Sequence, residues 1–86
     1  MLVTICPSDD ERGVARLLVA LQAAGVMYDD FIDSSLGLGV NVFRFHDGQA
    51  VTVYRDVWFV DLEGPDELVN RIVELLSSNS EYTTPR

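Results

Sequence analysis

The first apolar stretch of the chain is short and rich in β-branched residues. It covers residues 2–6 and stops at Pro7, a length that suits a strand and is too short for a helix. Apolar residues then recur at helical spacing, between a capping-box sequence at Ser8 to Glu11 and Gly25, which suits a left-handed C-terminal cap. The pattern predicts a strand over 2–6 and a helix over 9–24, whose buried face consists of Val14, Leu17, Leu18 and Leu21.

Residues 26–38 show no clean alternation, and we expect a loop there with room for a short edge strand. Two apolar runs follow, over 40–46 and 50–62, and Asp47-Gly48 between them is typical of a two-residue type I′ hairpin. Such a hairpin pairs Phe45 with Ala50 and Phe43 with Thr52. The second run is too long for one strand, so we expect a turn or a bulge at Arg55-Asp56 and a further strand over 57–62.

This register separates an aliphatic face of the sheet from an aromatic one. The aliphatic face, which we expect helices to cover, collects Val40, Val42, Val51, Val53, Trp58, Val60 and Leu62. The aromatic face projects Phe43, Phe45, Tyr54 and Phe59 beside Asn41, Thr52 and Asp61. A monomer rarely leaves so many aromatic side chains uncovered, so this face is a candidate protein-binding surface. Two alternatives stay open: the register after Arg55 differs, or residues 26–38 fold over this face.

A second helix is predicted after Glu63-Gly64-Pro65, with Pro65 at its first position and its end at residues 77–79. Its buried stripe consists of Leu68, Ile72, Leu75 and Leu76. The element order β-α-β-β-β-α predicts an α+β fold, a two-layer sandwich of a mostly antiparallel sheet with two helices on one face. We expect one domain over 1–79 and a disordered C-terminal tail over 80–86.

The amino-acid composition excludes several classes of function. The 86 residues carry a net charge of -8, with six arginines and no lysine. The charge argues against binding to a nucleic-acid backbone, and the missing lysine excludes Schiff-base chemistry and P-loop phosphate binding. One cysteine and one histidine make neither an internal disulfide nor a structural zinc site. With no long apolar run and no basic leader, we expect a cytoplasmic protein that needs no cofactor.

The acidic segment at Asp29, Asp30 and Asp33 is a second candidate protein-binding feature. Three carboxylates are able to bind a divalent cation, but this segment lacks the alternating ligands and the glycine of an EF-hand loop. We therefore expect a solvated acidic loop with no metal, which attracts a partner with a basic surface.

Two stretches resemble known families. Cys6-Pro7 before the first helix resembles the Cys-Pro of small sulfur-carrier proteins, which implies a reactive thiolate; the residues themselves favour a small buried side chain that ends a strand. The stretch 10–26, with Gly13 near its start and Ala24-Gly25-Val26 at its end, is similar to the first helix of the ACT regulatory domain. That resemblance implies a homodimer that senses an amino acid.

These observations lead to two hypotheses of different classes. The first is a small, acidic, non-enzymatic protein-interaction module of the inhibitor, immunity or anti-defence type found in bacteria and phages, which binds a basic partner surface. The second is an ACT-like small-molecule-sensing domain that acts as a homodimer. An enzyme that uses Cys6 ranks last.

Overall fold

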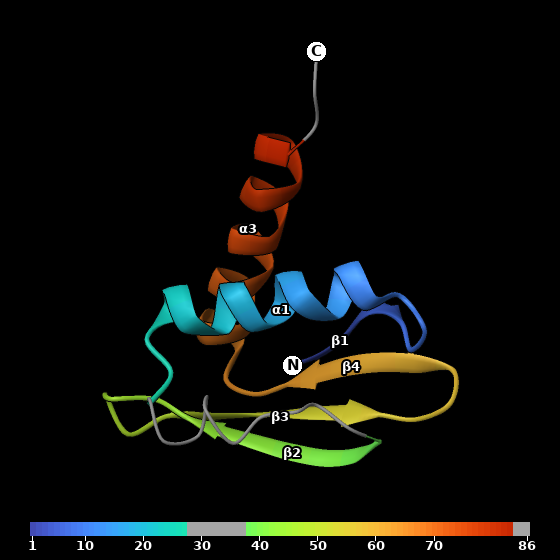
Figure 1. The fold of residues 1–86 in the computed structure, drawn as a ribbon. Coiled ribbons are helices and arrows are strands. Elements are labelled where there is room, and N and C mark those ends of the chain that lie inside the picture. The colour runs from blue at the N-terminus through green and yellow to red at the C-terminus, as the bar shows by residue number, and fades with distance from the viewer. Residues whose placement is uncertain (28–37, 84–86) are drawn as a thin grey trace.

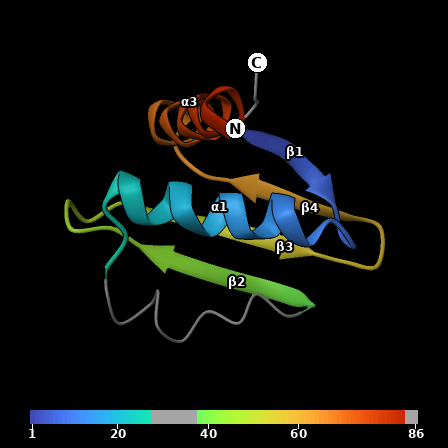
Figure 2. The ribbon, with the colours of Figure 1, turned by 45° about the horizontal axis from the view of Figure 1, so that its top comes forward.

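The computed structural model describes residues 1–27 and 38–83, and the side chains as far as Ser77. Its elements are β1 (Leu2–Pro7), α1 (Glu11–Ala24), β2 (Gly39–Arg44), β3 (Ala50–Arg55), β4 (Phe59–Glu63) and α3 (Asp66–Thr83). The strands form one antiparallel sheet in the order β1-β4-β3-β2, and both helices lie on the same face of it (Figures 1 and 2). The predicted α+β fold and element order are confirmed.

The first helix begins two residues later than predicted, because Asp10 and not Ser8 caps it. The Asp10 carboxylate accepts a hydrogen bond of 2.9 Å from the Gly13 N–H, which satisfies one of the free donors of the first turn. The predicted glycine cap at the other end is confirmed. Gly25 adopts a left-handed φ of 103°, and its N–H donates to the Gln22 carbonyl at 3.1 Å.

The second helix extends further than predicted. It begins at Asp66 and continues to Thr83, beyond the serine and asparagine residues at 77–79 where the sequence suggested an end. Figure 1 shows that α3 crosses α1 and then continues away from the sheet. Residues 84–86 of the predicted tail lie outside the described residues.

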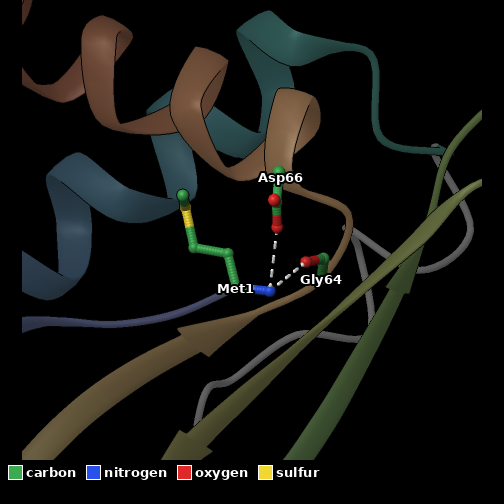
Figure 3. A network of polar contacts seen from close by, with 3 residues as sticks. All are labelled: Met1, Gly64 and Asp66. Atoms are coloured by element: carbon green, nitrogen blue, oxygen red, sulfur yellow. Dashed lines mark hydrogen bonds and ion pairs between the residues drawn. The ribbon is translucent and has the colours of Figure 1, made fainter.

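The start of β1 is fastened to the connection between β4 and α3 (Figure 3). The terminal ammonium of Met1 donates to the Gly64 carbonyl at 2.9 Å and lies 3.2 Å from the Asp66 carboxylate. The Gly64 N–H returns a hydrogen bond of 3.0 Å to the Met1 carbonyl. The pairing of β1 with β4 thus continues to the first residue of the chain.

The hairpin between β2 and β3 differs from the prediction by one residue. Phe43 pairs with Val51 and Arg44 with Ala50, and the Phe45 N–H donates to the Gln49 carbonyl at 2.8 Å. The loop therefore holds three residues, 46–48, in which Gly48 has a φ of 91°, as in a type I turn followed by a left-handed residue. A shift of one residue sends every side chain of the strand to the other face.

This shift overturns the predicted faces of the sheet. Phe43 and Phe45 are 1% and 4% exposed and belong to the core under the helices, so the expectation that they project from an uncovered face is wrong. Val40, Val42 and Trp58, expected in the core, are exposed instead. The other members of the predicted aliphatic face are buried as expected: Val51, Val53, Val60 and Leu62.

Candidate protein-binding surface

The face of the sheet opposite the helices presents two rows of side chains that cross all four strands. Cross-strand partners lie on the same face of a sheet, so the pairing assigns the rows directly. We call these eight residues the outer face: Leu2, Glu63, Thr52 and Val42 in one row, and Thr4, Asp61, Tyr54 and Val40 in the other. Its aliphatic residues, Leu2, Val40 and Val42, are between 56% and 65% exposed.

The polar groups of the outer face are ordered by hydrogen bonds. The Thr4 hydroxyl donates to the Asp61 carboxylate at 2.8 Å, and the Tyr54 hydroxyl donates to the Glu63 carboxylate at 2.8 Å. This hydrogen bond to Glu63 is the largest cause of a raised Tyr54 pKa. Asp61 and Glu63 thus give the face an acidic centre, while Arg44, in the next row of β2, is at its margin.

The turn between β3 and β4 presents a second apolar surface, which we call the turn patch: Pro7, Val57, Trp58 and Phe59. Trp58 is 72% exposed, more than any other large hydrophobic residue that the structure describes. Pro7 and Phe59 pair between β1 and β4, so the patch continues directly into the outer face.

Asp56 holds this turn in one conformation. Its carboxylate accepts hydrogen bonds from the N–H groups of Trp58 at 2.7 Å and Phe59 at 2.8 Å, and its own N–H donates to the Phe59 carbonyl at 3.1 Å. The hydrogen bonds from Phe59 and Trp58 lower the pKa of the Asp56 carboxyl, because they stabilise its charged form.

The turn is also anchored to the loop between β1 and α1. The Ser8 N–H donates to the Trp58 carbonyl at 3.0 Å. The Arg55 guanidinium donates to the Ser8 carbonyl at 2.6 Å and to the Ser8 hydroxyl at 3.2 Å. Ser8 is buried, so these contacts form a fixed base beneath an exposed tryptophan.

The structure brings only part of the predicted site together. Tyr54 and Phe59 lie at the exposed surface of the sheet, as expected, whereas Phe43 and Phe45 do not. The acidic residues Asp29, Asp30 and Asp33 lie outside the described residues. Sequence reasoning missed Val57 and Trp58, although an apolar pair directly after the turn residue Asp56 was a visible signal.

Cys6 has the environment of a structural thiol. It is buried against α1, and burial raises the pKa of its thiol, with a further increase from the Asp10 carboxylate that Arg16 and Arg55 partly oppose. These conditions disfavour a thiolate nucleophile. Among the side chains of residues 1–27 and 38–77, no three His, Cys, Asp or Glu residues are grouped to hold a metal ion.

Comparison with known proteins gave no relative: no family model matches the chain, and neither the curated proteins nor the solved structures contain a significant match. In the described part of the chain, no helix combines the length and hydropathy that crossing a membrane would require.

Proposed function

We propose that this protein is a non-enzymatic protein-binding module that inserts Trp58 and its turn patch into an apolar pocket of a partner with basic residues around it. The observation that carries the proposal is an exposed tryptophan on a fixed turn, in which Asp56 accepts a hydrogen bond from the Trp58 N–H and Ser8, itself held by Arg55, donates to the Trp58 carbonyl. Tryptophan is the residue most enriched at binding hot spots, and a fixed conformation reduces the entropy lost on binding.

Charge supports a basic partner. The chain has a net charge of -8, and Asp61 and Glu63 lie on the outer face beside the turn patch. Acidic groups at the rim of an apolar contact attract a positively charged surface and accelerate association. The role proposed for the module is that of an inhibitor, immunity or anti-defence protein in the cytoplasm, which would use this acidic surface to block a basic surface of its target.

The test compares variants of the turn with a matched control. Trp58→Ala is the test variant, and Val19→Ala truncates another exposed apolar residue, which lies on α1 and is not part of the turn patch. Partners captured from the organism of origin by wild type are purified, and their affinity for each variant is measured by calorimetry. Truncation of a hot-spot tryptophan costs about 2 kcal/mol or more of binding free energy, so Trp58→Ala should weaken binding about 30-fold or more, while the Val19→Ala control binds like wild type.

Two results would overturn the proposal. One is a purified partner that binds the Trp58 variant as tightly as wild type. The other is a wild-type dimer, seen by light scattering, that becomes monomeric in the variant, since a second copy would then occupy the turn patch. An on-rate that falls steeply with salt supports the basic character of the partner, and a salt-independent on-rate contradicts it.

A further inference from the structure

A groove lies beside the edge strand β1 and between the two helices, and none of its lining residues belongs to the turn patch. It has a volume of about 370 Å³, within the range of small-molecule sites. Ile5 of β1 forms one wall, and the two helices supply the others, α1 with Gly13 and Arg16, and α3 with Val73, Leu76 and Ser77. The two helices that line it cross each other, and α3 continues beyond α1 (Figure 1).

The walls of this groove combine aliphatic side chains with one cation. Ile5, Val73 and Leu76 are all partly buried against the core, so they offer apolar surface that a ligand can cover. Arg16 is half-buried, and its guanidinium has no hydrogen bond or ion pair with the side chains that the structure describes, those of residues 1–27 and 38–77. A guanidinium has five donors arranged to bind a carboxylate with two parallel hydrogen bonds.

One carboxylate beside this groove is already engaged in a hydrogen bond. Asp10 stands at the Gly13 end of the groove, where its carboxylate accepts the helix-capping hydrogen bond from the Gly13 N–H at 2.9 Å. Its charge disfavours a doubly charged ligand such as a phosphate more than a singly charged one. The combination of one arginine, one nearby carboxylate and aliphatic walls therefore selects a monoanion with a hydrocarbon chain.

We propose that this groove binds a small amphipathic carboxylate, with the carboxylate on Arg16 and an unbranched aliphatic chain between Ile5, Val73 and Leu76. The volume equals that of about twelve water molecules, which accommodates a ligand of about ten non-hydrogen atoms, the size of octanoate. This site is separate from the turn patch, so the inference stands independently of the proposed protein-binding function.

The experiment is a titration of the isotope-labelled protein followed by amide chemical shifts. Octanoate is compared with octanamide, which keeps the chain and loses the charge, and with acetate, which keeps the charge and loses the chain. Arg16→Gln is compared with Arg12→Gln, the same substitution at an exposed position of α1 that does not line the groove.

We expect octanoate to shift the amides of Ile5, Gly13 and Leu76 and to bind about tenfold more tightly than octanamide, as a charge-assisted hydrogen bond provides. Arg16→Gln should weaken octanoate about tenfold and leave octanamide unchanged, which also shows that the variant is folded. Arg12→Gln should bind like wild type. The proposal is overturned if octanoate and octanamide bind equally well, or if Arg16→Gln binds octanoate as tightly as wild type. It is also overturned if octanoate shifts amides elsewhere in the protein or does not bind at all.

Discussion

Truncation of Phe43 tests the register of the β2–β3 hairpin, from which both faces of the sheet follow. Phe43 is 1% exposed and packs in the core, and removal of such a ring costs about 3–5 kcal/mol. A chain of 86 residues has a total stability of about 4–13 kcal/mol, so Phe43→Ala would remove a large share of it. Val42 is 56% exposed on the outer face, and Val42→Ala should cost less than about 1 kcal/mol.

Urea unfolding followed by circular dichroism measures both variants. Phe43→Ala should lower the midpoint by about 1 M or more with little change in slope, and Phe43→Leu, with a cost of about 1 kcal/mol, provides a folded variant for the same comparison. The two-residue hairpin predicts the opposite order, with Val42 in the core and Phe43 at the surface. A larger loss of stability for the valine variant than for either phenylalanine variant would therefore refute the register described above.

Three further outcomes follow from individual residues. Hydrogen bonds from the Phe59 and Trp58 N–H groups lower the pKa of the Asp56 carboxyl, so the stabilisation they give the turn is fully present above the pKa of the unfolded carboxyl and is lost as the pH falls through the lower folded pKa. The amide chemical shifts of Trp58 and Phe59 should therefore titrate with a midpoint below 3.8, and a midpoint at or above 3.8 would contradict these hydrogen bonds. Cys6, buried and with a raised pKa, should react with iodoacetamide at neutral pH much more slowly than glutathione and at a similar rate after unfolding in urea; rapid reaction of the folded protein contradicts its burial. Because Gly48 has a φ of 91°, Gly48→Ala should lower the free energy of unfolding by about 1–2 kcal/mol, and Gly48→Asn should lower it by less. Equal stability of wild type and the alanine variant in urea would exclude the left-handed turn.

The elements could be predicted from the sequence because their signals are local. The helical spacing of Leu17 and Leu21, the cap at Gly25 and the proline before α3 each act within one or two turns of chain. The element order, and with it the fold class, followed from these signals. The start of α1 did not, since Ser8 and Asp10 are both good caps, and the choice depends on Arg55, which binds Ser8 from the far end of β3.

The predicted aromatic face was wrong because the register of the β2–β3 hairpin could not be read from local signals alone. Asp47-Gly48 suits a two-residue hairpin, but it suits equally a three-residue loop with Gly48 in the left-handed position. The alternation over 40–46 then allows either the valines or the phenylalanines to face the helices. Two aromatic rings bury more apolar area than two valines, so the register that buries Phe43 and Phe45 has the lower free energy.

Gly13 lies where α1 packs tightly against Cys6 of β1, and it gives a last prediction in which two effects oppose each other. Alanine is favoured over glycine inside a helix by about 1 kcal/mol. A methyl group at this position, however, would lie 2.8 Å from the Cβ and Sγ atoms of Cys6 and from the Asp10 carboxylate. Cys6 pairs with Val60 of β4, so its Cβ atom cannot move away without a shift of the backbone.

We expect the steric cost to prevail, because overpacking of this kind costs about 1–3 kcal/mol and exceeds the helix preference over most of that range. Gly13→Ala should therefore destabilise the protein in urea. Ala15→Gly, at an exposed position of the same helix, measures the preference alone. A double-mutant cycle with Cys6→Ala should recover part of the loss, since it removes the sulfur contact and keeps the Cβ contact. If Gly13→Ala instead stabilises the protein by the amount that Ala15→Gly destabilises it, α1 lies further from β1 than described, and the wall of the groove beside Arg16 is displaced with it.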